Sequence, residues 1–510
     1  MEFLKHRLHH ARRSRNKARC GIRHQHPIAV LRYTNKYFWI LLIPVVRTLI
    51  AYSFNLVHLM RVMWWDILII AFFFLLAWLR WYFTEYMLGD DSILCVNGFI
   101  AKQASEIPYS KISAVTAEKY MWMYPLKCSY ILIDTDAKST EMKKTSPDIK
   151  LIMRDDDIDR VFSIVKRQDM DENVYTSRIS KGSLVSFSLL FSSALSGVTL
   201  LGALLINAGD IVGDTLQNTF FSAVNTAAET VNNKALYIIA KIPTVTITIA
   251  IIIFIGWLIS FLGNLLRHMH FTFEKRGGSI TISDGFLTQR KYHIQRDHIN
   301  YADLRQNLLM KLFRVMSVNV NCSGYGKGKN EIPVFIPISK SAKVRSILKR
   351  IFPDMEWEAD TIPIKFRYIW RYVGPPAVIL NLITVAAGVL ICLFREWFDV
   401  IFFTMIMAQV PILWLLIVKT AAFCTSGVSY NREVVCLKYC RGYEFHTILV
   451  PEDRISKIVI SRNIFQQFNG SCDFIVYTNS EYTKSHRVRG VDYRSALWLF
   501  NKYSESESTP

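Results

Sequence analysis

The sequence lacks the short motifs that mark the common catalytic sites. It contains no H-E-x-x-H, no G-x-x-x-x-G-K-S/T, no G-x-S-x-G and no G-x-G-x-x-G after a predicted strand. These motifs provide a zinc site, a phosphate-binding loop, a nucleophilic serine and a dinucleotide site, respectively. The glycine-rich stretch 324–329 joins two predicted strands and opens no helix, which indicates a hairpin loop. We therefore expect no enzymatic activity, no cofactor and no metal site.

Paired cysteines and acidic residues are also scarce. The nine cysteines are odd in number and show no C-x-x-C spacing, which favours reduced thiols over a disulfide framework. Asp and Glu total 41 against 61 Lys and Arg. The segment 1–36 holds ten of these basic residues and a single acid, Glu2. Such a basic arm is typical of a segment that stays on the cytoplasmic side of a membrane or contacts its anionic surface.

Long apolar runs, by contrast, are abundant. Hydrophobic residues make up 51% of the chain and charged residues 20%, and the mean hydropathy is +0.21. A helix needs about 20 apolar residues to cross about 30 Å of hydrocarbon. Runs near that length lie at 37–56, 65–83, 183–206, 243–266, 368–394 and 398–418. The sequence thus predicts six transmembrane helices in three pairs, at 37–83, 183–266 and 368–418.

The charges that flank these runs predict their orientation. Between the two runs of the second pair, the connection 207–235 holds three acids and one base, Lys234, whereas the arm 1–36 is strongly basic. Positively charged flanks remain in the cytoplasm. The connection 207–235 is therefore expected outside. Because the number of predicted spans is even, both termini and the segments that follow each pair are expected in the cytoplasm.

One pattern of turn and strand residues occurs three times, each time after a pair of apolar runs. Each copy has a glycine between two short alternating stretches, which is typical of a β-hairpin, and closes on a basic amphipathic segment with helical spacing, seen best at 161–167 and 344–350. The copies contain Gly98, Ile107, Pro108 and Ile112; Gly285, Ile294 and Ile299; and Gly442, Val450, Pro451 and Ile455. We predict three small β-domains, each with a closing helix, at 84–170, 267–355 and 423–505.

This order of features resembles the bacterial pleckstrin-homology-like (PH-like) domain of membrane proteins, called bPH2 and formerly DUF304. The first copy, I-P-Y-S-K-I, matches best; Gln295 replaces the proline in the second copy, and Glu452-Asp453 replaces Tyr-Ser in the third. The three-copy layout, over about residues 37–505, is similar to the larger member of paired membrane proteins of Gram-positive bacteria.

The resemblance has several implications for fold and function. It implies an α + β protein of the bacterial cytoplasmic membrane, in which each pair of transmembrane helices precedes a cytoplasmic PH-like β-barrel or sandwich with a C-terminal helix. It also implies a smaller sister protein with one such domain, and a part in resistance to membrane-active antimicrobial peptides, including bacteriocins. We expect a non-enzymatic binding and scaffolding protein. A homo-oligomer is compatible with the same layout.

Basic residues next to the predicted spans are candidates for binding anionic lipid or a partner. Each Lys or Arg near an anionic leaflet contributes about 1 kcal/mol. The alternative is that these residues only enforce topology. No base-reading motif accompanies the arm, so nucleic acid is not favoured. The candidates are Arg12, Arg13, Arg15, Lys17 and Arg19 in the arm, Arg290 with Lys291, and Arg487 with Arg489.

Two further features have both a functional and a structural interpretation. Arg47 lies in the middle of the first apolar run, where an unpaired charge costs about 2.5–3.5 kcal/mol. It marks either a polar site of a transporter or lipid-handling protein, or a helix kinked at Pro44 whose arginine reaches the interface. The I-P-Y-S-K-I motif is either a ligand site or a turn at the entrance of a strand, and the turn is favoured because Pro108 fixes the backbone there.

Overall fold

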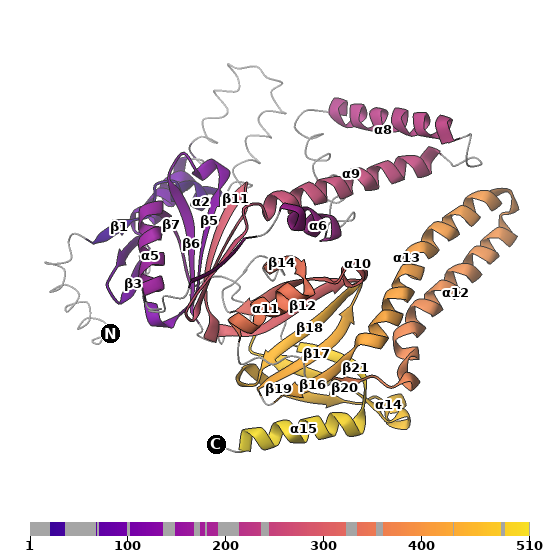
Figure 1. The fold of residues 1–510 in the computed structure, drawn as a ribbon. Coiled ribbons are helices and arrows are strands. Elements are labelled where there is room, and N and C mark those ends of the chain that lie inside the picture. The colour runs from indigo at the N-terminus through magenta and orange to yellow at the C-terminus, as the bar shows by residue number, and fades with distance from the viewer. Residues whose placement is uncertain are drawn as a thin grey trace.

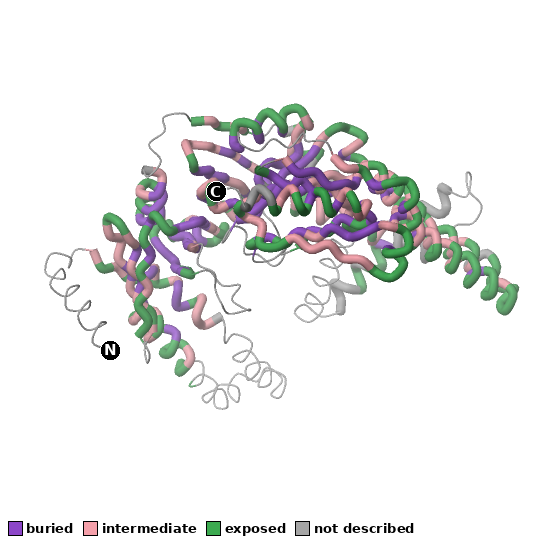
Figure 2. The backbone as a smooth tube through the Cα atoms, turned by 90° about the horizontal axis from the view of Figure 1, so that it is seen from below, coloured by how far each residue is buried: buried purple, intermediate pink, exposed green. Residues whose placement is uncertain are grey.

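The fold was analysed in a computed structural model, which describes residues 21–35, 68, 71–98, 102–135, 148–167, 174–178, 181–191, 214–235, 244–322, 334–352, 361–431, 433–480 and 485–508. Three β-rich units follow one another along the chain (Figure 1). We call them the first unit (β1–β7 with α5), the second unit (β8–β14 with α11) and the third unit (β15–β21 with α15). Buried residues concentrate along their strands (Figure 2).

The first unit begins inside the segment 1–36, which was predicted to be a basic cytoplasmic arm. Strand β1 (Ile22–His24) pairs with β2 (Glu85–Leu88), and α2 (Ala29–Asn35) follows it. Arg23 of β1 forms an ion pair with the buried carboxylate of Asp157. The sheet continues through β3 (Ser92–Asn97) and β4 (Gln103–Pro108) in the order β1-β2-β3-β4. Residues 21–35 are therefore part of a folded unit, unlike the prediction for 1–36.

The first and second units share one seven-stranded sheet, in the order β7-β6-β5-β11-β10-β9-β8. The antiparallel pairing of β5 with β11 runs from Thr288 opposite Tyr120 to Ile294 opposite Ala114. Backbone hydrogen bonds thus join two units whose strands are far apart in sequence. The strands are β5 (Ile112–Tyr120), β6 (Cys128–Thr135), β7 (Ile149–Arg154), β8 (Val174–Arg178), β9 (Thr272–Arg276), β10 (Ser279–Asp284) and β11 (Thr288–Gln295).

The same arrangement joins the second unit to the third. Here β12 pairs with β18 in a sheet of order β14-β13-β12-β18-β17-β16-β15, and β19-β20-β21 form a last, three-stranded sheet. Successive side chains of each strand point to opposite faces of the sheet, so every second residue lies on the same face. The strands are β12 (Ile299–Asn307), β13 (Val315–Cys322), β14 (Val334–Lys340), β15 (Ile362–Pro363), β16 (Gly427–Asn431), β17 (Val434–Arg441), β18 (Glu444–Pro451), β19 (Ile455–Ser461), β20 (Ser471–Thr478) and β21 (Ser485–Asp492).

Each unit has an apolar core that a helix closes. The helices α5 (Asp155–Arg167), α11 (Ser341–Ile351) and α15 (Tyr493–Ser508) bury Val161, Val344 and Leu499, respectively. The core of the second unit also includes Val434, Cys436 and Leu449 from the third unit. The apolar contacts, like the sheets, therefore continue from one unit to the next.

The prediction of six transmembrane helices in three pairs is wrong for the part of the chain that the structure describes. Two helices there are long and apolar enough to cross a membrane, at Phe366–Leu393 and Ile401–Thr425. Two further apolar helical stretches, Ala71–Tyr82 and Ile251–Arg267, do not meet that criterion. The second is the part of the 24-residue helix Thr244–Arg267 whose side chains the structure describes. The run 37–56 and most of 183–206 lie outside the described residues. Apolar composition was therefore not sufficient to predict the number of spans.

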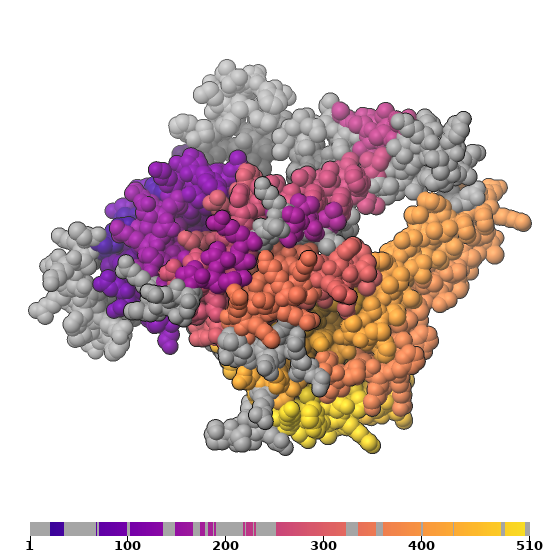
Figure 3. All heavy atoms as spheres, viewed as in Figure 1, coloured from indigo at the N-terminus to yellow at the C-terminus, as the bar shows by residue number. Residues whose placement is uncertain are grey.

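The helices of the third predicted pair form a hairpin that projects from the sheets (Figures 1 and 3). They are α12 (Trp370–Leu393) and α13 (Phe398–Thr425), and most of their side chains are exposed. The second predicted pair contributes α6 (Lys181–Phe191) and α9 (Thr244–Arg267). Part of the connection 207–235 that was predicted to be outside forms α8 (Asp214–Ala235), which lies along α9.

All three predicted hairpin glycines have a positive φ: 110° at Gly98, 99° at Gly285 and 60° at Gly442. Gly285 is the most constrained, because a Cβ there would lie 2.0 Å from the carbonyl oxygen of Thr288. Around Gly442, by contrast, no atom lies within 4 Å of a Cβ.

We predict that Gly285→Ala destabilises the protein by about 1–3 kcal/mol or more, because the new Cβ adds a backbone clash to an unfavourable φ. The measurement is the thermal unfolding midpoint of the purified full-length chain in mild detergent. Gly442→Ala is the matched control, with strain in φ but no clash. A midpoint for Gly285→Ala at or above that of Gly442→Ala would contradict the prediction.

Candidate functional site

The repeated motif forms the same turn in all three units. In each, a residue in extended conformation precedes a 3-10 turn, and an isoleucine then starts the next sheet. The three turns are η1 (Tyr109–Lys111), η3 (Arg296–His298) and η6 (Glu452–Arg454). They follow Pro108, Gln295 and Pro451, with φ of −63°, −84° and −60°, and lead into Ile112, Ile299 and Ile455, with φ of −79°, −77° and −82°. The motif thus passes the chain from one sheet to the next.

The motif side chains fit this structural role. Ile107, Ile294 and Val450 are buried at the ends of β4, β11 and β18. The Tyr109 hydroxyl, which was a candidate ligand group, is buried and donates to the carbonyl of Gly89 at 3.1 Å. Glutamine can replace proline in the second unit because an extended φ of −84° is open to any residue.

Arg290 and Lys291, predicted as lipid or partner contacts, lie in the β5–β11 seam. Arg290 Nε is 3.7 Å from Glu118 Oε1 on the facing strand. Lys291 Nζ is 3.5 Å from Asp159 Oδ1 and 4.5 Å from the centre of the Phe162 ring. Both basic side chains therefore connect the second unit to the first. Their binding of lipid stays a prediction.

Arg487 belongs to a polar cluster where the third unit meets α12, which we call the membrane junction. At its centre is Asp473 of β20, whose side chain is fully buried. Its Oδ2 accepts from Arg371 of α12 at 3.0 Å and from Nε of Arg487 at 2.9 Å. Its Oδ1 accepts from Gln466 Nε2 at 2.7 Å and from the backbone of Gly490 at 3.3 Å. One carboxylate thus holds four groups, among them an arginine of a membrane helix.

Three further contacts complete the membrane junction. The Tyr368 hydroxyl donates to the carbonyl of Asn469 at 2.8 Å, and the Tyr372 hydroxyl donates to that of Arg489 at 2.9 Å. Lys365 Nζ is 2.8 Å from Asp492 Oδ1. Val418 and Ala422 of α13 are buried in the core of the third unit. The hairpin α12–α13 is therefore built into the third unit rather than tethered to it.

A second buried carboxylate, Asp303, lies in the β12–β18 seam. His446 Nδ1 of β18 is 3.1 Å from Asp303 Oδ1, and Arg305 Nε donates to Oδ2 at 2.7 Å. Burial opposes ionisation, but the hydrogen bond and charge of His446 and the charge of Arg305 hold the pKa of Asp303 below its usual range. Nearby, burial lowers the pKa of His486 to about 4, and its Nδ1 lies 3.0 Å from the Tyr439 hydroxyl. The seam therefore contains a buried carboxylate that is held by two basic side chains.

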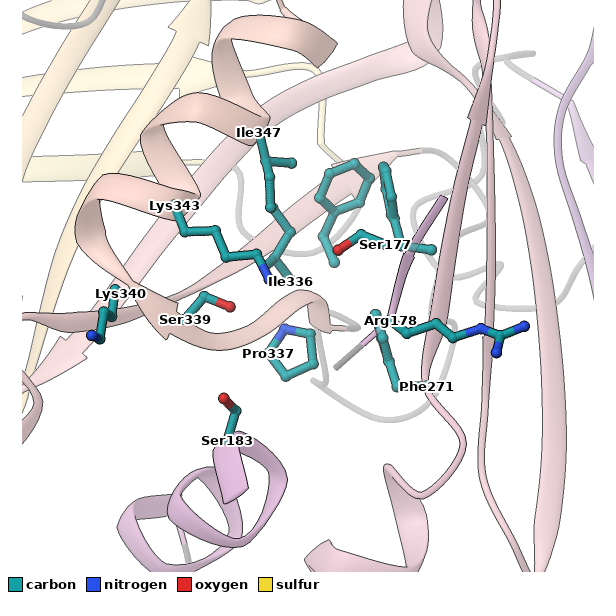
Figure 4. A pocket seen from close by; sticks show the side chains of 12 residues that line it. Ser177, Arg178, Ser183, Phe271, Ile336, Pro337, Ser339, Lys340, Lys343 and Ile347 are labelled. Carbon is teal, nitrogen blue, oxygen red and sulfur yellow. The ribbon is translucent and has the colours of Figure 1, made fainter. Parts of the chain in front are cut away.

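A cavity of about 290 Å³ lies in the second unit, between α6, β8, β14 and α11 (Figure 4). Phe271, Phe273, Phe335 and Ile347 give it an apolar lining, and Ser177, Ser183 and Ser339 supply hydroxyls. In Figure 4 the guanidinium of Arg178 points away from the cavity, as does Lys340. Lys343 also lines the cavity, and in Figure 4 its amine points toward Ile336. The lining thus combines apolar side chains with hydroxyls and one amine.

The remaining predicted site residues cannot be placed. Arg12, Arg13, Arg15, Lys17 and Arg19 lie outside the described residues, and so does Arg47. Within the described part of the chain, no group of three or more His, Cys, Asp and Glu side chains is arranged to hold a metal ion. The described residues thus form sheets that the units share and one membrane junction.

Comparison with known proteins agrees with this architecture. The family model described as "Bacterial PH domain" matches residues 38–168 and 234–351. The transmembrane protein YdbT of Bacillus subtilis (strain 168) is 22% identical over 275 residues, which is 52% of this chain and 52% of that protein. Two stretches of the chain thus match the bacterial PH domain, and the chain is similar to the transmembrane protein YdbT. It spans about half the length of this curated relative.

The matched stretches cover most of the first and second units and stop before the third unit. The third unit nevertheless repeats their motif turn, with φ and ψ at the flanking residues within a few tens of degrees.

Sequence reasoning missed Asp473 and Asp303, because an acid in an alternating strand normally indicates a face in solvent. The sequence around Asp473 reads S-C-D-F-I-V-Y. The only signal of burial there is that the acid lies between a cysteine and a phenylalanine in an otherwise apolar strand.

Proposed function

We propose that this protein is a non-enzymatic scaffold of the bacterial cytoplasmic membrane that holds three PH-like units in a fixed relation beside the bilayer. The observation that carries this proposal is the pairing of β5 with β11 and of β12 with β18. Independent binding modules on linkers would be free to reorient. Units that share sheets and cores instead present their surfaces at set positions, as a scaffold requires.

Charge at the membrane junction supports a cytoplasmic position for the third unit. Lys365, Arg367 and Arg371 lie at the start of α12, and Lys419 lies in α13 near its end. The turn between α12 and α13, with the first turn of α13, carries Arg395 against Glu396 and Asp399, and so has no excess of positive charge. Basic flanks favour the cytoplasmic side. The start of α12 and the end of α13, which both enter the third unit, are therefore assigned to the cytoplasm.

The function we assign to the scaffold is resistance to membrane-active peptides, in contact with anionic lipids and with a smaller PH-like sister protein. This assignment draws on the family resemblance and on the apolar helices. The alternative, a transporter or lipid-handling protein, relied on Arg47, and no described contact favours it.

We expect that Ile112→Asp abolishes protection of a strain that lacks the gene against such peptides. Ile112 is 1% exposed, and a buried charge there would disrupt the core of the first PH domain. Ser110→Asp, two residues earlier on an exposed turn, is the matched control and should retain protection. Survival is compared at equal membrane abundance. Full protection by the Ile112→Asp variant would refute the scaffold role.

Arg47→Leu separates the two functions. A scaffold retains protection with this substitution, whereas a transporter that uses the arginine loses it without losing abundance. Co-purification in mild detergent then identifies the sister protein and the bound lipids.

A further inference from the structure

We propose that a short apolar loop of each PH-like unit inserts into the lipid interface beside the membrane helices. The three loops, which we call tips, are 121–126 between β5 and β6, 308–313 between β12 and β13, and 464–469 between β19 and β20. They contain η2 (Met121–Met123), α10 (Leu308–Leu312) and α14 (Ile464–Asn469). The inference goes beyond the scaffold role and rests only on attachment of the protein to the membrane.

The tips have a common construction. Each directs one side chain inward, namely Met123, Met310 or Gln466, and all three are buried. Each tip is followed by a residue in the left-handed region just before the next strand: Lys127 with φ 47°, Arg314 with φ 53° and Gly470 with φ 67°. A residue in this conformation fixes the direction in which the chain passes from the loop into the next strand.

Most of the other large side chains of the tips are exposed and apolar, with Lys311 and Gln467 as polar exceptions. Phe465 and Phe468 are 82% and 80% exposed, among the highest values for large hydrophobic residues in the described chain. The remaining exposed ones are Met121, Trp122, Leu126, Leu309, Leu312, Phe313 and Ile464. Single exposed apolar residues are ordinary, but rigid apolar loops at the same position in three units indicate a shared apolar environment.

Contacts of the first and third tips with apolar helices identify that environment as lipid. In the third unit, the backbone carbonyl of Asn469 accepts a hydrogen bond from the Tyr368 hydroxyl, and its Oδ1 lies 3.5 Å from the guanidinium of Arg367. Tyr368 and Arg367 lie at the start of the span Phe366–Leu393. Phe366 and Trp370 are exposed at the same end of this span. In the first unit, Met123 belongs to a cluster against which Trp81 packs, at the end of the apolar helix Ala71–Tyr82. Aromatic residues at such helix ends are typical of the bilayer interface.

The third tip is also held rigidly enough to act as an anchor. Asn463 and Gln466 form a capping box, in which the backbone N–H of Asn463 donates to Gln466 Oε1 at 2.7 Å. Gln466 in turn donates to Asp473, the carboxylate that binds Arg371 of α12. The tip and the membrane helix are thus fixed to one buried group. Exposed basic side chains nearby, Arg367 and Lys365, suit anionic headgroups.

The test uses the full-length chain in nanodiscs that contain a phospholipid with a photoreactive group on its acyl chain close to the glycerol. Mass spectrometry then identifies the labelled peptides. We expect label on the third tip and on α12, and loss of the tip label in the double variant Phe465→Ser/Phe468→Ser with α12 still labelled. Trp498 of α15, 58% exposed and distant in sequence from any tip, gives the control Trp498→Ser, which should leave the label on the third tip unchanged.

The outcomes distinguish the inference from the proposed function. Label on α12 with none on the third tip overturns the anchor and leaves the membrane scaffold standing. Cross-links between tips of two copies, without lipid label, overturn it in favour of an interface between copies. Absence of label on both the tip and α12 overturns membrane attachment and the anchor together.

Discussion

Replacing Asp473 with alanine is expected to lower the stability of the third unit by about 3–5 kcal/mol, the usual cost of breaking a buried ion pair from one side. The substitution leaves Arg371 and Arg487 without the carboxylate that both contact, and Gln466 loses its acceptor as well. The unit should then separate from α12. A fall in the thermal unfolding midpoint in detergent, together with faster proteolysis after α12, measures this effect.

Lys365→Ala is the matched control at the same junction. Lys365 also pairs with a carboxylate, that of Asp492, but its side chain is 61% exposed. An exposed pair of this kind is worth about 0–1 kcal/mol, because solvent screens the charges and holding the side chains in place costs entropy. Shifts of equal size in the two variants, or no shift in Asp473→Ala, would show that the buried carboxylate does not hold the junction.

The local features of the fold were the ones that the sequence could predict. Gly98, Gly285 and Gly442 have the positive φ that a hairpin turn requires, and 161–167 and 344–350 lie in closing helices as expected. Both signals come from residues that are close together in the chain. A positive φ is strongly unfavourable for most side chains, and helical spacing leaves one apolar face, so each pattern allows few structures.

Partners across the chain could not be predicted in the same way. Alternation in β5 or β11 shows which face of a strand is buried, but not which strand lies beside it. The charge pair of Arg290 with Glu118 follows from that unpredicted pairing, so the sequence indicated Arg290 only as a candidate contact for lipid or a partner. Likewise, Arg371 lies 102 positions from Asp473, and no spacing rule connects a charge in a strand to one in a membrane helix.

The apolar runs show a related limit. A window of apolar residues predicts a buried helix, but the same composition fits a span, a core helix or a helix too short to cross. Ala71–Tyr82 and Phe366–Leu393 both come from predicted spans, but among the described residues only the second reaches the length of one. The paired-helix layout was therefore the part of the sequence interpretation that the structure corrected.

The β12–β18 seam allows the last prediction. Asp303→Ala is expected to cost about 3–5 kcal/mol, because Arg305 and His446 lose a fully buried partner and the second and third units meet at that point. Glu444→Ala is the control, since Glu444 is 43% exposed and lies 3.8 Å from the same histidine. Asp303→Asn keeps the shape of the side chain but removes its charge and replaces one of its two acceptor oxygens by a donor, so it should fall between the two.

The thermal unfolding midpoints of these three variants in detergent rank the contributions directly. A seam held by the buried ion pair gives the order Glu444→Ala, Asp303→Asn, Asp303→Ala from most to least stable. If Asp303→Asn matches the wild type, the seam needs neither the charge of Asp303 nor its second acceptor oxygen. If Asp303→Ala also matches it, backbone pairing and the apolar contacts of Cys436 and Leu449 alone join the two units, and the buried carboxylate has no part in holding the scaffold together.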